Sequence, residues 1–194
     1  LYENTRPFQN IPFQFSIYKT SSDSALSTGN ENTSGPIHVS FLAEAGTDPR
    51  KEFLLNFLKE SEGEGSILVY DTFLEKAILN SLKKDFPEFS EKIDQRISRL
   101  IDLLVPFKNK VLYSDKMNGN FSLKDVSAAF LPENKFEKLK INTGRLSMIA
   151  YESLLHETDL IKIIETREAL EEYSKTDTES MMKIVEVMKK VSNK

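Results

Sequence analysis

Residues 67–69 form a wholly apolar run, Ile-Leu-Val, between two segments whose apolar residues recur at helical spacing. The first segment starts with a cap and proline at Asp48-Pro49 and ends at Gly63, and the second starts at Asp71-Thr72. A short apolar strand between two helices is typical of a parallel sheet that is covered on both faces. The run therefore predicts an α/β fold with helices packed on a sheet.

Two further strands are predicted upstream of this run. Apolar and polar residues alternate along residues 11–19 and again along residues 36–43, which is the pattern of strands with one buried face. Residues 20–35 between them consist mainly of Ser, Thr, Asn and Gly, so we expect a flexible hairpin loop there. Hairpin, helix, strand and helix together predict one mixed sheet in a single domain over residues 1–194.

The rest of the chain is predicted to be mainly helical. Residues 111–113 are the one later strand candidate. The expected helical segments are 87–104, 122–131, 147–156, 160–173 and 176–191.

Composition removes several classes of chemistry. There is no cysteine, and the two histidines, His38 and His156, are far apart in sequence, so thiolate nucleophiles and zinc sites are not expected. The formal charge of −4 gives no global attraction to nucleic acid. No apolar stretch approaches the ~20 residues of a membrane span, and we expect a soluble cytoplasmic protein with no membrane partner. Catalysis would have to use carboxylates, hydroxyls, Lys or Arg.

Glu75 is the first candidate site residue. It shares a helical face with Ile78, Leu79 and Leu82, so a carboxylate lies on the side of the helix that packs. The alternative is an ordinary acidic residue in a first helical turn, where the helix dipole favours an anion.

Asp177 is the second candidate. Tyr173, Asp177, Met181 and Ile184 follow each other at intervals of four, four and three, which places Asp177 on an apolar seam if the helix is unbroken. The alternative is a capping box, Thr-Asp-Thr-Glu at residues 176–179, that starts a new helix and makes Asp177 a first-turn acid.

Beyond these two residues, the order and spacing of several phrases resemble a known family. The chain resembles the larger, C-terminal part of the RNase H-like 3′-to-5′ exonucleases of the DEDD type, and most closely the bacterial family called domain of unknown function 2779. The phrases that carry the resemblance are LYENTRPFQNIPFQFS (1–16), FLAEAGTDPRKEF (41–53), VYDTFLEK (69–76), IDLLVPF (101–107), NGNFSLKDV (118–126) and YSKTDT (173–178).

The resemblance implies a chemistry. In that group four acidic residues hold two divalent metal ions, Mg²⁺ or Mn²⁺, and a Tyr or His positions the attacking water. Glu75 matches the acid of the second motif, where Asp is more usual, and Asp177 matches that of the third. Tyr173 would make this the tyrosine variant, and Asp71 stands where the group commonly has Asn.

Two further residues match with simpler explanations beside them. Asp102 occupies a recurring acidic position, although an acid that bonds to nearby backbone is the favoured interpretation. Lys124 follows Ser122, which is predicted to cap a helix, and would be available to a substrate phosphate.

The first motif of the group, Asp-x-Glu on the first strand, is absent, and the chain opens at Leu1 rather than Met. We therefore expect part of a longer protein, a missing first strand and no activity in this fragment. That strand would lie between residues 11–19 and 67–70, so its loss predicts a sheet split there, or self-association through exposed strand edges. The alternative to an exonuclease of DNA or RNA is a non-catalytic module that binds nucleic acid or protein with the same fold.

Overall fold

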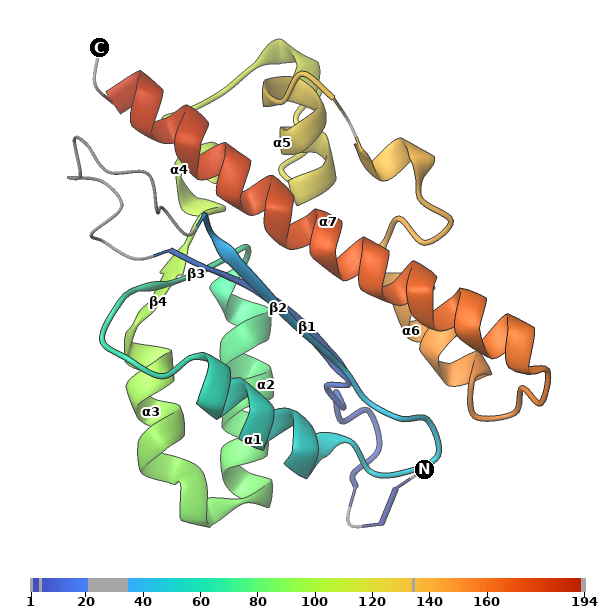
Figure 1. Cartoon of the computed structure of the whole chain (residues 1–194). Coiled ribbons are helices and arrows are strands. Elements are labelled where there is room, and N and C mark those ends of the chain that lie inside the picture. The colour runs from blue at the N-terminus through green and yellow to red at the C-terminus, as the bar shows by residue number, and fades with distance from the viewer. Residues whose placement is uncertain (1, 4, 21–34, 134, 193–194) are drawn as a thin grey trace.

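A computed structural model of the chain describes residues 2–3, 5–20, 35–133 and 135–192 (Figure 1). It is a mixed α/β structure in which two small sheets lie among helices. The strands are β1 (Gln14–Lys19), β2 (Ile37–Leu42), β3 (Ile67–Val69) and β4 (Leu100–Asp102). The α-helices are α1 (Arg50–Glu60), α2 (Thr72–Asp85), α3 (Ser90–Ser98), α4 (Val105–Lys108), α5 (Leu123–Phe130), α6 (Gly144–Ser153) and α7 (Leu160–Ser192). Short 3₁₀ turns are η2 (Pro87–Phe89), η3 (Asp115–Met117) and η4 (Lys135–Lys138).

The predicted hairpin is confirmed. Strands β1 and β2 pair antiparallel, with Phe15 opposite Phe41. These two rings pack against a core formed by helices α1, α2 and α3. The predicted loop at 20–35 falls almost wholly outside the described residues. In Figure 1 the hairpin lies between α1–α3 on one side and α7 on the other.

The second pair of strands is parallel, with Ile67 opposite Leu100 and Val69 opposite Asp102. This corrects the predicted helix over residues 87–104, of which only η2 and α3 form. The Arg99 guanidinium bonds to the carbonyls of Ser61, Gly63 and Gly65, which fixes the chain as α3 ends. Pairing with β3 then outweighs the local helical pattern.

Residues 111–113, the later strand candidate, are not a strand. The N–H groups of Val111 and Leu112 both donate to the carbonyl of Pro106, at 2.9 and 3.2 Å. This turn closes the end of α4, so the segment has no extended partner.

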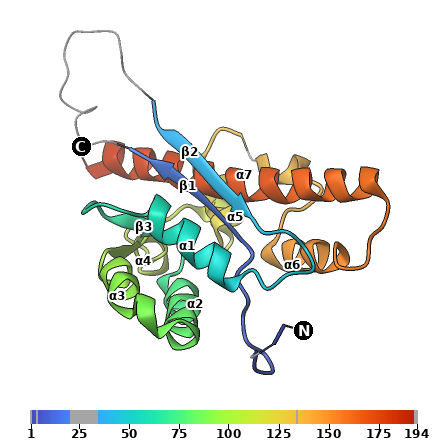
Figure 2. The ribbon, with the colours of Figure 1, turned by 60° about the horizontal axis from the view of Figure 1, so that its bottom comes forward.

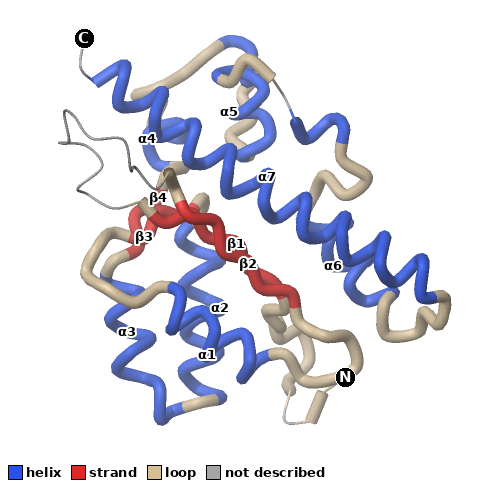
Figure 3. Tube along the Cα trace, in the orientation of Figure 1, coloured by secondary structure: helices blue, strands red, loops and turns tan. Residues whose placement is uncertain are grey.

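The described strands form two sheets instead of the one mixed sheet predicted from the residue pattern, with a break between β1 and β3 where the resemblance implied a missing strand. Among the described residues β1 bonds only to β2 and β3 only to β4, giving two separate two-stranded sheets (Figure 3). Both contribute to the same core, since Phe15 of β1 and Leu100 of β4 pack against the cluster of α1–α3. The two pairs are therefore neighbours on one core without forming a continuous sheet.

One face of the β3–β4 pair is partly exposed among the described residues. Leu68 and Ile101 lie opposite each other in the register and are 39% and 47% exposed. The described residues therefore do not bury residues 67–69 on both faces, which corrects the prediction from the apolar run.

Helix α7 is one continuous helix, where two segments were predicted. Residues 174–176 continue it, because they contain no helix breaker and the Thr178 hydroxyl donates to the Ser174 carbonyl within the helix. The hairpin holds it through side chains: Gln14 donates to the Leu170 carbonyl and Thr178 to that of Ser16. In Figure 2, β1 and β2 cross in front of α7 at an angle.

Two further apolar clusters complete the packing. Phe107, Met117, Val126 and Ile184 join α4, η3 and α5 to the second half of α7. Tyr151, Leu154 and Leu170 join α6 to the first half of α7 and to the hairpin. Among the described helices, none has both the length and the apolar composition needed to cross a bilayer.

Candidate functional site

The candidate site begins where β3 ends. Asp71 has a left-handed backbone, with φ of 72°, and its carboxylate accepts from the N–H of Phe73 at 3.1 Å to cap α2. Tyr70 precedes it, and its hydroxyl donates to the Phe121 carbonyl at 2.6 Å. The turn from β3 into α2 is thus fixed at both residues.

Asp102, at the end of the neighbouring β4, holds the same turn. Its carboxylate accepts from the N–H groups of Asp71, Thr72 and Leu104 and from the Thr72 hydroxyl, at 2.8–3.2 Å. Burial alone would raise the pKa of Asp102, but these hydrogen bonds outweigh it and the pKa is lowered. Asp102 therefore has the backbone-bonding role that the sequence favoured.

Glu75 lies in the first turn of α2 and is half-buried. Burial, followed by the charges of Asp71 and Asp102, raises its pKa to about 7. Within the described part of the chain, no Lys, Arg or His forms an ion pair with it. Nothing among the described residues therefore offsets the cost of burying this carboxylate.

Asp177 lies in the middle of α7, so the capping-box alternative is wrong and the apolar-seam alternative is confirmed. Burial raises its pKa to about 7, although a hydrogen bond from the Tyr173 hydroxyl works in the opposite direction. Burial also raises the pKa of Tyr173, followed by the charge of Asp177, so the phenol keeps its proton and donates. The Tyr173 hydroxyl lies beside Gly144, at the start of α6.

The structure brings some of the predicted residues together. Asp71, Glu75 and Asp102 gather at the ends of β3 and β4, and Tyr173 and Asp177 form a second pair on α7. Asp177 and Ile184 share a helical face two turns apart, ~10 Å along the axis. Ile184 packs in the cluster that Tyr70 joins, so this face of α7 is directed toward the end of β3.

Neither acid appears among the charges that shift the pKa of the other. The convergence of Glu75 and Asp177 on one ion cluster stays a prediction. Lys124 is half-buried next to Ser122, which caps α5 as predicted, and its role toward a phosphate also stays a prediction.

The sequence reasoning placed Tyr70 and Thr72 at the carboxyl end of the strand over residues 67–69 but gave neither residue a role. The signal that could have found them is a repeated pattern: an apolar run followed by Asp occurs at residues 67–71 and again at 100–102. Two such runs suggest neighbouring parallel strands whose acids meet at one edge.

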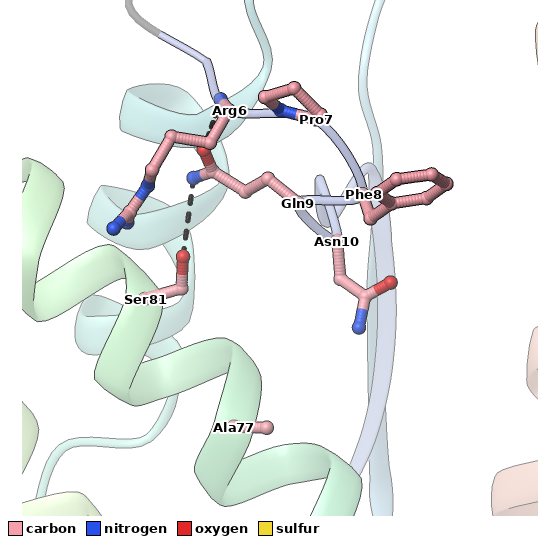
Figure 4. A pocket seen from close by; sticks show the side chains of 7 residues that line it. All are labelled: Arg6, Pro7, Phe8, Gln9, Asn10, Ala77 and Ser81. Atoms are coloured by element: carbon pink, nitrogen blue, oxygen red, sulfur yellow. Dashed lines mark hydrogen bonds between the residues drawn. The ribbon is translucent and has the colours of Figure 1, made fainter.

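A hollow between the N-terminal segment and α2 is separate from these residues (Figure 4). It is lined by Arg6, Pro7, Phe8, Gln9, Asn10, Ala77 and Ser81. The Gln9 amide donates to the Ser81 hydroxyl at 3.1 Å, while the Phe8 ring is directed away from α2. Ala77 and Ser81 lie on the opposite side of α2 from Glu75, so the hollow does not extend this site.

Comparison with known protein families gives a match. The family described as Domain of unknown function (DUF2779) matches residues 1–122, which is more than half of the chain. The chain belongs to this family. The DUF2779 match contains Glu75 and Asp102, whereas Tyr173 and Asp177 lie beyond it. Neither the curated proteins nor the solved structures give a match.

Proposed function

We propose that this DUF2779 chain is part of an RNase H-like, metal-dependent 3′-to-5′ exonuclease of the tyrosine DEDD type, which hydrolyses phosphodiester bonds of DNA or RNA. One observation carries the proposal: Glu75 and Asp177 are half-buried carboxylates, each with a pKa raised to about 7 and neither with a cationic partner among the described residues. Such groups are costly to a fold and are concentrated at functional sites.

The split sheet supports the same proposal. An antiparallel hairpin and a parallel pair sit on one core without pairing to each other, and a strand with Asp-x-Glu between β1 and β3 would join them. It would enter beside the ends of β3 and β4, where Glu75 lies. In this proposal the added strand accounts for the gap, and divalent cations bound by the completed site would account for the uncompensated acids.

The metal requirement can be compared with the residues present. Within the described residues no group of three or more His, Asp or Glu side chains is placed to hold a metal ion. The chain alone does not fit a two-ion centre, which needs a bridging carboxylate. We therefore derive no metal-dependent step from it, and Mg²⁺ or Mn²⁺ belongs to the proposal for the longer protein.

Tyr173 has a positioning role in this proposal. Its phenol is protonated at neutral pH and donates to Asp177, which holds the hydroxyl beside that carboxylate. A fixed phenol orients a water molecule without binding the metal ion. Lys124, which has no ion-pair partner among the described residues, would contribute charge to a substrate phosphate.

The decisive experiment compares the 194-residue chain with the same chain extended at its N-terminus by an Asp-x-Glu strand. Release of nucleotides from labelled single-stranded DNA and RNA is measured with Mg²⁺ or Mn²⁺. The extended chain is expected to degrade one of them and the shorter chain neither. In the extended chain, Asp177→Ala should abolish activity, whereas Tyr173→Phe should lower it and leave Mn²⁺ binding by calorimetry unchanged.

Glu186→Gln, an exposed change on the same helix, is the matched control. Robust activity of the 194-residue chain, or full activity of the extended Asp177→Ala variant, would contradict the proposal. So would an extended chain that folds, contains Asp-x-Glu and degrades neither substrate.

A further inference from the structure

The outer edge of β2 has free backbone groups at a known register. The Ala43 N–H donates to the Phe13 carbonyl at 2.8 Å, so these residues form a hydrogen-bonded pair of the hairpin. Because such pairs alternate, the pairs Ser16–Ser40 and Tyr18–His38 are of the other kind. The N–H and C=O groups of Ser40 and His38 therefore point away from β1, and no other described residue bonds to them.

The neighbouring groups on this strand are already occupied. The Arg167 guanidinium donates to the carbonyls of Leu42 and Ala43, at 3.3 and 3.1 Å, and so closes the end of the edge. The His38 ring is held by the Ser16 hydroxyl at 2.8 Å and by the Tyr18 ring at 4.7 Å between centroids. What remains open is a short length of backbone on a fixed strand.

The same two residues line a hollow of about 390 Å³ against α7, together with Glu168, Glu171, Glu172 and Lys175. All four side chains from α7 are exposed, and none forms an ion pair with another described residue. Three carboxylates against one ammonium group give this hollow an acidic character. It lies directly beside the free edge.

We propose that the outer edge of β2 binds an extended segment of a partner protein with basic side chains, which adds a strand to the hairpin. Its backbone would bond to His38 and Ser40, and Lys or Arg at alternate positions would reach the glutamates of α7. Alternate residues of a strand are ~6.8 Å apart, close to the ~6 Å between Glu168 and Glu172 along the helix.

Charge selects this occupant over two others. A symmetric contact between two copies through β2 would offer residues 37–42, which contain no Lys or Arg for the glutamates. A nucleic acid would place phosphates against three carboxylates. The inference is independent of the exonuclease proposal, because it uses neither Glu75 nor Asp177.

The test is fluorescence anisotropy of a labelled eight-residue peptide of alternating Lys and Val titrated with the 194-residue chain. Saturable binding is expected, with at least ~10-fold weaker affinity when Lys is replaced by Glu. Methylation of the backbone nitrogens on the bonding edge of the peptide should weaken it similarly, because the strand then loses its donors. An acidic or methylated peptide that binds as well as the original would overturn the proposal.

Variants of the protein locate the contact. Ser40→Pro removes an N–H that the hairpin does not use and should abolish binding, while Ser40→Thr retains it. The double change Glu168→Gln and Glu172→Gln should weaken binding at least ~10-fold, and Glu186→Gln should not change it. Since Ser40→Pro could alter the hairpin, the circular dichroism spectrum is checked, and the methylated peptide tests the same bonds with unchanged protein. Binding unaffected by the glutamate changes, or a dimer through β2 in light scattering that excludes the peptide, would overturn the proposal.

Discussion

Replacing Asp177 by Asn is expected to stabilise the protein at neutral and alkaline pH. The side chain lies on the packed face of α7, where burial raises its pKa from 3.8 to about 7. Asn has nearly the same shape and its carbonyl oxygen can still accept from Tyr173. The substitution therefore removes the charge while keeping the hydrogen bond.

The magnitude follows from linkage between protonation and folding. A raised pKa means that ionisation favours the unfolded state, so the destabilisation is absent below pH 3.8, grows as the pH rises to about 7 and is constant above that. At ~1.4 kcal/mol per pH unit, the shift has an upper bound of ~4 kcal/mol. Because the side chain is only half-buried and retains contact with water, we expect ~1–2 kcal/mol.

The assay is urea unfolding of the original chain and of Asp177→Asn at pH 4.5, 6 and 8, followed by circular dichroism. The gain in free energy of unfolding should increase from pH 4.5 to pH 8. Glu186→Gln, exposed on the same helix, should give no such trend. A gain that is independent of pH, or a loss at pH 8, would refute the reasoning that burial of this charge is uncompensated.

Three further substitutions test the other acids and the buried Arg50. Glu75→Gln should raise the free energy of unfolding by ~1 kcal/mol at pH 8 and by less at pH 4.5, because folding raises the pKa of Glu75 from 4.5 to about 7. Urea unfolding at the two pH values measures this, and equal effects at pH 4.5 and pH 8 would contradict it. Asp102→Asn should lower the free energy of unfolding by ~2 kcal/mol at pH 7, since the Asn amide cannot accept all four hydrogen bonds that the carboxylate accepts. Because the pKa of Asp102 is lowered, its contribution is present above pH 3.8 and lost as the pH falls through the lower folded value, so the two chains should converge in acid unfolding. Arg50 forms ion pairs with Asp48 at 2.6 Å and with the mostly buried Asp85 at 2.9 Å. Arg50→Met should cost ~3 kcal/mol in thermal unfolding, because the Asp85 carboxylate loses this partner. A melting temperature unchanged from the original would show that these two ion pairs are dispensable.

Local patterns in the sequence predicted the hairpin, the caps of α2 and α5 and the α/β class. The predicted cap at Asp48 with a proline at the first helical position is wrong by one residue, because Pro49 itself takes the N-cap position of α1 without a side-chain cap bond. Alternation of apolar residues places β1 and β2, and Ser122 caps α5 as its residue type indicates. Where local patterns did not predict the secondary structure, contacts between distant segments determine it. Residues 100–102 resemble part of a helix and become a strand because β3 offers a parallel partner.

The candidate site shows the same division. The spacing of apolar residues predicted the helical face on which Asp177 lies. It did not predict that the helix continues through residues 174–176, because the sequence of residues 176–179 also fits a capping box that would start a new helix. The anchoring of Thr72 to Asp102 joins residues thirty positions apart and has no local signature. Sequence could name the acids at this edge but could not say which of them the fold itself satisfies.

Asp102 differs from Glu75 and Asp177 in whether hydrogen bonds within the fold stabilise its charged form. Asp102 receives hydrogen bonds from four donors, its pKa is lowered, and folding alone explains its presence. The charge of Asp102 also acts on Glu75, yet the pKa of Glu75 is raised. Burial is the main cause, and no donor or cation among the described residues offsets its cost. Asp177 repeats this condition on another helix with only Tyr173 to assist it. An acid that destabilises the fold at neutral pH is a candidate for a role outside folding, and a ligand that supplies positive charge beside either acid would remove the cost at that position.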